Sequence, residues 1–159
     1  MNAFIKLGVI EPLAQALYQQ GIRIPTVIQQ ASIPAIFKGK DIIGRSETGT
    51  GKTLAYLLPL VQRVDVKKGG TQVLIMTPTR ELAKQIFDVL RPFAILMEAD
   101  VAEIIGGRTI ENQIQKLKRE PHIIIGTPGR LLDHIRRRSL DLSGVKTVVL
   151  DEADQMLAA

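Results

Sequence analysis

The stretch SETGTGKT, residues 46–53, places two glycines, a lysine and a threonine directly before the apolar run LAYLLPLV. Gly49 and Gly51 can adopt positive φ without steric cost, so the backbone can curl and aim consecutive N–H groups inward. The apolar run predicts a helix over about 52–65, whose first turn adds free N–H groups and the positive end of the helix dipole. The stretch therefore predicts an anion site.

Short β-branched runs alternate with longer amphipathic runs over the rest of the chain. The expected strands are 41–45, 72–77, 101–106, 122–127 and 147–152. The expected helices are 11–21, 27–39, 52–65, 79–91, 109–119 and 128–138. Strands that are apolar on both faces and are separated by helices predict an α/β fold, a mostly parallel sheet with helices on both faces.

A polar motif stands at the carboxyl end of each expected strand. In chain order these motifs are SETGTGKT (46–53), PTRELA (78–83), GG (106–107), TPGR (127–130) and DEAD (151–154). Ligands of open α/β sheets bind beyond the carboxyl ends of the strands. We therefore expect the five motifs on one rim of the sheet.

The first and last motifs together indicate nucleotide chemistry. A strand, a glycine-rich loop and a helix are typical of a phosphate-binding P-loop, in which Lys52 would reach the terminal phosphates and Thr53 would ligate Mg²⁺. Asp151 would hold Mg²⁺ partly through water, and Glu152 would orient and deprotonate the attacking water. The strict motif has Gly where Ser46 stands. A glycine-rich helix cap, and an acidic helix N-terminus for either acid alone, are the structural alternatives.

Composition limits the other possibilities. The net charge of +5 is compatible with a polyanionic partner, and an aromatic content of 4% argues for contacts to its backbone rather than stacking on bases. The absence of cysteine excludes disulfides and thiolate zinc sites and fits a reducing cytosol. No apolar run approaches the ~20 residues of a membrane helix, so we expect a cytoplasmic protein without membrane contact. His122 and His134 lack metal-ligand spacing and are interpreted as polar residues at element edges.

These motifs, together with GIRIPTVIQ (21–29), resemble those of DEAD-box ATP-dependent RNA helicases, in the family's order and over essentially all 159 residues. The resemblance implies the first of two RecA-like P-loop NTPase domains. It predicts a region of the family's glutamine motif, with an N-terminal helix, over 1–30, and the ATP-binding domain of the helicase over 31–159.

The resemblance also implies an ATP site. Gln29 would read the adenine edge, because an amide offers both a donor and an acceptor. Ile22 replaces the family's usual aromatic, so we expect weaker nucleotide affinity. Phe4 matches the family's upstream aromatic; the structural alternative is that it packs the N-terminal segment, and both can be true. The predicted nucleotide-binding residues are Ile22, Ile24, Gln29, Ser46, Glu47, Thr48, Gly49, Thr50, Gly51, Lys52 and Thr53; the catalytic ones are Lys52, Asp151 and Glu152.

The remaining motifs resemble the family's RNA-binding motifs. The threonines and arginines can donate to phosphate oxygens, and such contacts position RNA without reading its sequence. The alternative is that the threonines cap helices and the arginines pair with carboxylates. HIRRRS (134–139) and KLKRE (116–120) are interpreted as solvated helix faces. The predicted RNA-binding residues are Pro78, Thr79, Arg80, Gly106, Gly107, Thr127, Pro128, Gly129 and Arg130.

The sequence ends at Ala159, soon after the DEAD motif. The family's Ser-Ala-Thr motif and its second RecA-like domain, with arginine fingers, do not follow. We therefore expect a domain truncated at the C-terminus that binds adenine nucleotide, hydrolyses it very poorly and does not unwind duplexes alone. The family's next strand inserts between the P-loop strand and the DEAD strand, so its absence would leave sheet edges open to association.

Three alternatives remain. A small kinase would need a lid and an acceptor pocket, and PTRELA and TPGR would have no role in it. A non-catalytic module derived from a helicase would bind RNA or a protein without hydrolysis. A DNA-directed helicase of the same superfamily differs chiefly in the Gln29 motif and in the spelling of the DEAD motif.

Overall fold

The computed structural model describes residues 2–40 and 50–158. The predicted elements within these ranges are present, at slightly different bounds, and the strand predicted at 41–45 lies outside them. Two short helices, α1 and α8, were not predicted. The elements are α1 (Ala3–Lys6), α2 (Glu11–Gln19), α3 (Val27–Phe37), α4 (Thr50–Arg63), β1 (Val73–Met76), α5 (Arg80–Leu96), β2 (Val101–Ile104), α6 (Ile110–Lys118), β3 (Ile123–Gly126), α7 (Pro128–Arg136), β4 (Thr147–Leu150) and α8 (Ala153–Ala158).

The chain forms two compact units. The first unit is Met1–Val64 with Val89–Met97, and the second is Asp65–Asp88 with Glu98–Ala159. We placed the boundary at residue 30 because a sequence motif ends there, whereas the two units are defined by compactness. This boundary stays a prediction. None of the helices in the described ranges is both long and apolar enough to span a membrane.

The first unit is helical, and its core forms around α2, α3 and α4. The side chains of Phe4, Leu13, Leu17 and Ile33 are fully buried. Gln62 on α4 accepts a hydrogen bond from the Ile10 N–H at 3.0 Å and donates one to the Gly8 carbonyl at 3.0 Å. These two bonds give partners to backbone groups of the loop before α2, and they tie this loop to α4.

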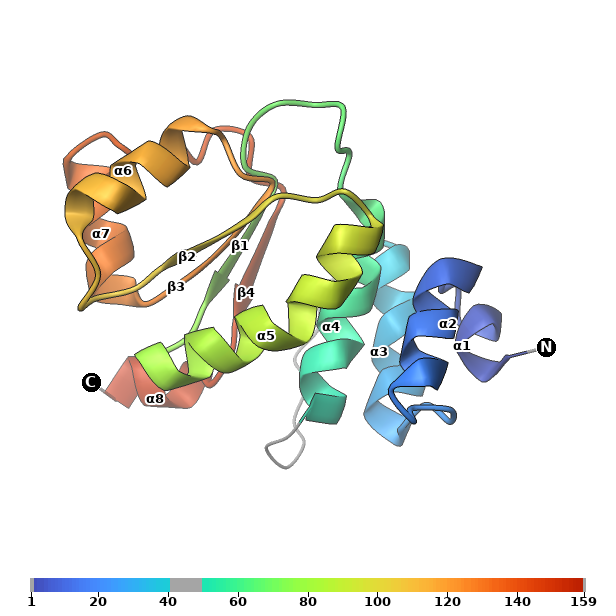
Figure 1. Cartoon of the computed structure of the whole chain (residues 1–159). Helices are drawn as coiled ribbons and strands as arrows, with labels where there is room; N and C mark the ends of the chain where they lie inside the picture. Colours follow the sequence, from blue (N-terminus) through green and yellow to red (C-terminus); the bar gives the residue numbers. More distant parts are fainter. Residues whose placement is uncertain (1, 41–49, 159) are drawn as a thin grey trace. The chain divides into compact units, whose positions relative to one another are not determined.

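The second unit is built on a parallel sheet with strand order β2-β3-β1-β4 (Figure 1). The register pairs Met76 with Gly126 and Leu150, and Ile104 with Gly126. The four strands therefore end at the same level. The residues that follow them, including three of the predicted RNA-binding motifs and the DEAD motif, leave the sheet along one edge, as predicted.

Helices α6 and α7 cover one face of this sheet (Figure 1). Leu117 of α6 and Leu131 of α7 pack in one core cluster with Leu74, Ala102, Ile104, Ile124 and Leu140. The alternate side chains of the inner strands are buried as well, Ile75, Ile123 and Ile125 among them. Apolar burial on both sides is typical of parallel strands and confirms the predicted fold class.

Strand β4 departs from the prediction. We predicted a buried strand over 147–152, but β4 is shorter, and Val148 and Leu150 are 54% and 53% exposed. The physical reason is its position, because β4 is the outer strand of the described sheet and pairs with β1. Asp151 and Glu152 lie in the turn after β4 rather than in the strand.

Gly126 at the end of β3 provides a test of this packing. A Cβ atom at this position would lie 2.6 Å from the carbonyl oxygen of Ile104 and 2.8 Å from the side chain of Leu131. Overpacking of a well-filled core costs about 1–3 kcal/mol. We predict that Gly126→Ala lowers the free energy of unfolding by that amount, measured by urea denaturation.

Gly129 is the matched control, because a Cβ atom there would meet no atom within 4 Å. Gly129 lies in the first turn of α7, where alanine has the better helix propensity. We expect Gly129→Ala to leave the stability unchanged or slightly raised. Equal losses for the two variants would contradict the packing described for Gly126.

Candidate functional site

Gln29 connects α3 to the first turn of α4 in the first unit. Thr26 and Gln29 form a capping box: Thr26 Oγ1 accepts from Gln29 N at 3.3 Å, and Gln29 Oε1 accepts from Thr26 N at 2.9 Å. The Gln29 Nε2 group donates to the Gly51 carbonyl at 3.0 Å, and the side chain is only 1% exposed. Each end of the amide can make one further hydrogen bond, as contact with an adenine edge would require.

The described part of the P-loop begins at the N-terminus of α4. A Cβ atom at Gly51 would lie 3.5 Å from Thr26 Cγ2 and 3.8 Å from Gln29 Nε2, so the glycine motif and the glutamine motif pack together. Lys52 and Thr53 are half-buried in the first turn of α4. A helix N-terminus of this kind favours anions. The predicted residues Ser46, Glu47, Thr48 and Gly49, and the side chain of Thr50, lie outside what the structure describes.

The segment before α3 carries the predicted apolar contacts. Ile22 is half-buried, and its N–H donates to the Leu17 carbonyl at 2.9 Å. Ile24 and Val27 are 80% and 84% exposed, which leaves apolar surface beside the glutamine motif. Phe4 is fully buried, so the structural alternative holds for this residue and its side chain packs the N-terminal segment.

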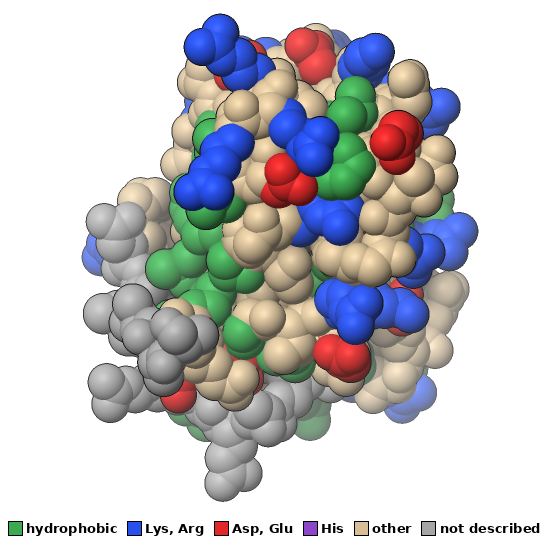
Figure 2. Space-filling model, turned by 90° about the vertical axis from the view of Figure 1, so that its left-hand side faces the viewer, with side chains coloured by type: hydrophobic (Ala, Val, Ile, Leu, Met, Phe, Trp, Pro, Cys, Tyr) green, Lys and Arg blue, Asp and Glu red, His purple; other side chains and the backbone are tan. Residues whose placement is uncertain are grey.

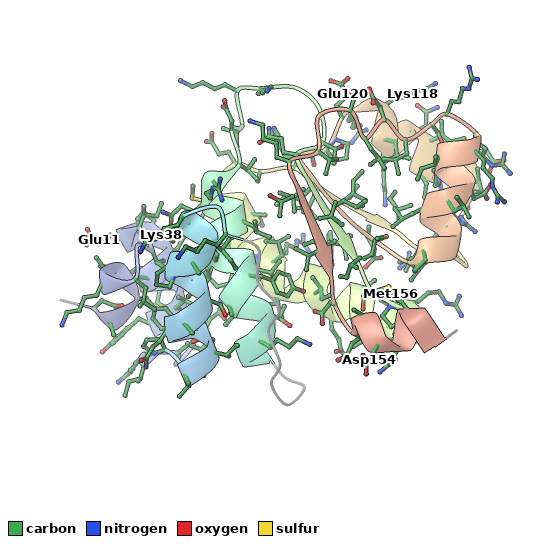
Figure 3. The ribbon with its side chains drawn as sticks, turned by 180° about the vertical axis from the view of Figure 1, so that it is seen from behind. Glu11, Lys38, Lys118, Glu120, Asp154 and Met156 are labelled. Carbon is green, nitrogen blue, oxygen red and sulfur yellow. The ribbon has the colours of Figure 1, made fainter. Side chains whose placement is uncertain are left out.

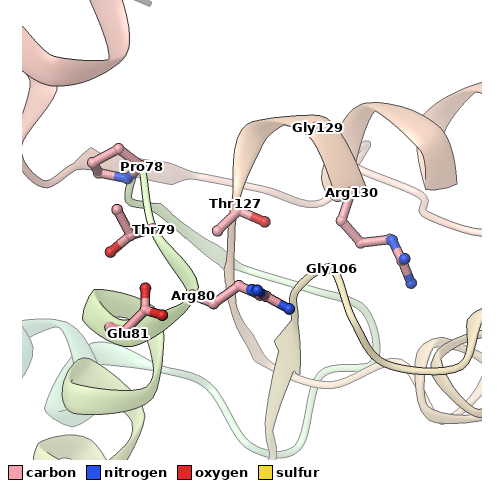
Figure 4. Close-up of a pocket in the computed structure, with 8 residues that line it drawn as sticks. All are labelled: Pro78, Thr79, Arg80, Glu81, Gly106, Thr127, Gly129 and Arg130. Atoms are coloured by element: carbon pink, nitrogen blue, oxygen red, sulfur yellow. The ribbon is translucent and has the colours of Figure 1, made fainter.

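A groove of about 450 Å³ lies at the carboxyl edge of the sheet in the second unit (Figure 4). Figure 4 shows Arg80 at the start of α5 and Arg130 on α7, whose side chains extend toward the loop that carries Gly106. Gly107 and Pro128 are neighbours of the lining in the sequence but do not line it. The lining residues are Pro78, Thr79, Arg80, Glu81, Gly106, Thr127, Gly129 and Arg130.

The structure shows which of the two threonines caps a helix. Thr79 Oγ1 accepts from the Leu82 N–H at 3.1 Å, so this hydroxyl caps α5. Thr127 stands at the N-cap position of α7, and its side chain makes no capping hydrogen bond. A hydroxyl that already accepts can still donate its hydrogen, so both threonines retain a donor for an anion in the groove.

The two arginines are not paired with carboxylates within the described ranges. The Arg80 guanidinium lies directly against Gly107, whose φ is +80°, where any Cβ atom would collide with it. Arg130 Nη1 donates to the Arg108 carbonyl at 2.8 Å and to Gln113 Oε1 at 3.1 Å. Both cations are held by neutral partners, so their charge remains available to an anion.

The DEAD motif follows β4. Asp151 is 8% exposed, and its N–H donates to the Met76 carbonyl at 2.9 Å, which continues the pairing with β1. Glu152 has φ of 58°, a left-handed conformation that is uncommon outside glycine and that turns the chain from β4 into α8. Asp154 is exposed on α8 (Figure 3).

Metal ligation stays a prediction. The described residues contain no group of three or more His, Cys, Asp or Glu side chains that could hold a metal ion. Of the predicted ligands, Thr53 belongs to the first unit and Asp151 to the second.

His134 stands in the last turn of α7, at the end of an element as the sequence indicated. His134 is fully buried on α7, with Nε2 2.8 Å from Gln113 Oε1 and Nδ1 2.7 Å from Ser139 Oγ. Burial, and next the positive charge of Arg130, lower the pKa of His134. Sequence reasoning missed Gln113 and placed Ser139 on a solvated helix face. The available signal was the position of Gln113 on the apolar face of its helix, four residues before Leu117.

The segments predicted to be solvated helix faces, 116–120 and 134–139, are exposed at their Lys and Arg residues, but Leu117 and His134 within them are buried. Lys116, Lys118 and Arg119 at the end of α6, and Arg136 to Arg138 at the end of α7, are all exposed. Figure 2 shows this side of the molecule with Lys and Arg side chains spread among Asp and Glu. Arg137 pairs with Asp133 at 2.9 Å, and this hydrogen bond lowers the pKa of the Asp133 carboxyl.

Comparison with curated proteins gives close relatives over nearly the whole chain. The chain is 46% identical over 157 residues to the DEAD-box ATP-dependent RNA helicase CshA of Geobacillus kaustophilus, and 48% identical over 157 residues to CshA of Bacillus cereus. The alignments cover 99% of this chain but 34% and 30% of those proteins. The chain therefore spans about a third of the length of the curated relatives it matches.

Two solved structures resemble the fold of this chain. A hypothetical ATP-dependent RNA helicase from Sulfolobus tokodaii matches with a TM-score of 0.81 and 37% identity, over 91% of this chain and 41% of that one. S. cerevisiae Dbp5 bound to RNA and ADP BeF3 matches with a TM-score of 0.88 and 30% identity, over 100% of this chain and 40% of that one. The fold is RecA-like. Residues 26–159 match the DEAD/DEAH box helicase family, and the chain belongs to that family.

Proposed function

We propose that this chain is the ATP-binding and RNA-binding half of a DEAD-box RNA helicase. In the full-length protein it would couple ATP hydrolysis to the unwinding or remodelling of RNA in the cytoplasm, where both substrates occur. A second RecA-like domain would complete the enzyme. The observation that carries the proposal is the convergence of PTRELA, GG and TPGR on one groove, with two arginines free of carboxylate partners in the described ranges.

Nucleotide binding in this proposal uses the first unit. The Gln29 amide reads adenine with its remaining donor and acceptor, while its bond to Gly51 sets its orientation. Ile22 and Ile24 cover the base, Lys52 neutralises the terminal phosphates, and the N–H groups at the start of α4 bind phosphate oxygens. Support comes from the packing of Gly51 against Thr26 and Gln29.

The proposed hydrolysis needs Mg²⁺, a carboxylate and a base. One hydroxyl (Thr53) and one carboxylate (Asp151), completed by water, suit a hard cation that prefers oxygen ligands. When bound, Mg²⁺ stabilises the negative charge that develops on the phosphates. Glu152 orients the attacking water and accepts its proton.

RNA binding in this proposal uses the groove of the second unit. Arg80 and Arg130 contact phosphates, the hydroxyls of Thr79 and Thr127 donate to phosphate oxygens, and Gly106 and Gly107 allow close backbone approach. The lining contains no aromatic ring on which a base could stack. Such contacts bind the backbone without reading its sequence.

Replacement of Lys52 tests the nucleotide site. Lys52→Ala removes the cation from the proposed phosphate site, so we predict at least a ~10-fold loss of affinity for a fluorescent ADP in equilibrium titration. Lys38→Ala removes the same charge from an exposed position after α3 and is the control. Saturable binding that survives Lys52→Ala unchanged would contradict the proposed site.

Replacement of Gln29 tests base recognition. Gln29→Glu removes the N–H donor to the Gly51 carbonyl and puts two acceptors in contact, at a cost of about 1–3 kcal/mol. We predict a lower free energy of unfolding and a reduced preference for ADP over GDP. Gln15→Glu, at an exposed position of α2, is the control. An unchanged preference for ADP would show that Gln29 does not read the base.

Replacement of Arg130 tests the groove. We predict that Arg130→Ala weakens binding of single-stranded RNA and reduces the slope of log K against log salt by about 0.7, the value for one phosphate contact on a single strand. Arg119→Ala, at the exposed C-cap of α6, should change both quantities less. DNA of the same sequence serves as the competitor. Stronger binding to DNA than to RNA would favour a DNA-directed helicase.

A further inference from the structure

Three polar side chains behind the groove form one hydrogen-bond network with Arg130. His134 on α7 is fully buried, Gln113 on α6 is 2% exposed, and Ser139 follows α7 and is half-buried. Buried polar groups are unfavourable unless they are hydrogen-bonded, so each member of the network depends on the others. The proposed contacts of the groove use Arg130 but leave its three supporting side chains unexplained.

The hydrogen-bond chemistry fixes the direction of these contacts. Gln113 Nε2 donates to the Ile105 carbonyl at 2.7 Å, which turns Oε1 toward Arg130 and His134. An amide oxygen only accepts, so Arg130 Nη1 at 3.1 Å and His134 Nε2 at 2.8 Å both donate to it. His134 therefore carries its proton on Nε2, and Nδ1 accepts the one hydrogen of the Ser139 hydroxyl at 2.7 Å, because the other acceptor of that hydroxyl, the His134 carbonyl, is farther away at 3.2 Å.

The charges around His134 favour the neutral ring. The charged groups that face it are Arg130 and Asp133 on α7 and Arg137 at the C-cap of α7, and α6 presents the neutral Gln113. Burial and Arg130 lower the pKa of His134, and Arg137 acts in the same direction, against the opposite effect of Asp133. A neutral ring supplies the N–H donor without adding a second positive charge beside Arg130.

Within the part of the chain that the structure describes, the network leaves the Nε–Nη2 edge of Arg130 without a hydrogen-bond partner. The two hydrogens of Nη1 are used by the Arg108 carbonyl and by Gln113 Oε1. Nε and Nη2 keep their hydrogens for a ligand in the groove that Arg130 lines (Figure 4). A planar fork of this kind matches two oxygens of one phosphate, provided that the guanidinium is held in a fixed orientation.

We propose that His134 is a positioning residue for RNA contact. Through Gln113 it holds the Arg130 guanidinium with its Nε–Nη2 edge toward the groove. The inference rests on the proposed function, because it takes the phosphate backbone of RNA as the ligand of Arg130.

A double-mutant cycle on RNA affinity tests this role in the whole chain. His134→Leu keeps a buried side chain but removes the donor to Gln113, and we expect a loss of affinity for single-stranded RNA of about 3- to 10-fold, the value of one hydrogen bond. In the Arg130→Ala background the same change should alter the affinity less than ~2-fold, because the group that His134 positions is gone. Equal losses in both backgrounds, or unchanged affinity of His134→Leu, would overturn the proposal.

Two further variants separate positioning from general packing. His134→Gln can place an amide N–H near the position of Nε2, so it should restore affinity to within ~2-fold of the unchanged chain. Leu117→Ala creates a cavity in the same core cluster and should lower stability without this loss of RNA affinity. A loss of RNA affinity in Leu117→Ala as large as the loss in His134→Leu would overturn the proposal. Should His134→Leu fail to fold, Ser139→Ala replaces it in the cycle, with the same dependence on Arg130 expected.

A measurement without RNA distinguishes this inference from the proposed function. Nitrogen-15 relaxation of the Arg130 Nε–Hε group should report a rigid side chain in the unchanged protein and a mobile one in His134→Leu. Equal mobility in both would overturn the positioning role. A chain that binds no RNA, or whose affinity is insensitive to Arg130→Ala, would instead overturn the proposed function of the groove, and the relaxation result alone would then decide whether His134 positions Arg130.

Discussion

The second unit depends on one constraint: its four parallel strands end at the same level. Met76, Gly126 and Leu150 pair across the sheet, and Ile104 pairs with Gly126. The segments that follow must therefore leave at one edge, where the groove forms. A slip of one residue would turn each strand's buried side chains to the other face. The packing of α6 and α7 on the sheet thus maintains the register, and the register assembles the groove.

Two buried glutamines perform the same task in the two units. Gln29 donates to the Gly51 carbonyl and accepts from Thr26 N; Gln113 donates to the Ile105 carbonyl and accepts from Arg130. Each amide donates its N–H₂ group to a backbone carbonyl, of the first turn of α4 for Gln29 and of the residue after β2 for Gln113, and uses its oxygen to order a second group. An ionised carboxylate could not donate and an aliphatic side chain could do neither, so neither could replace the amide in this role.

Much of this arrangement follows from sequence pattern. The runs of Ile and Val predicted the inner strands, and the parallel topology required PTRELA, GG and TPGR to meet at one edge. The pattern was misleading for β4, because the burial of Val148 and Leu150 depends on which segments cover them and not on their own hydrophobicity. It was misleading for His134 because a polar residue on an apolar helix face does not identify its partner, here Gln113, 21 positions earlier.

The contact between Arg80 and Gly107 links two motifs that stand well apart in the sequence. The guanidinium occupies the space that any side chain at 107 would need, and the positive φ of Gly107 disfavours other residues independently. A substitution at 107 would therefore displace the arginine as well as strain the backbone. Because the end of an arginine side chain can move at little cost, the positive φ is the stronger constraint, and glycine at 107 both holds this loop in its conformation and leaves room for the guanidinium.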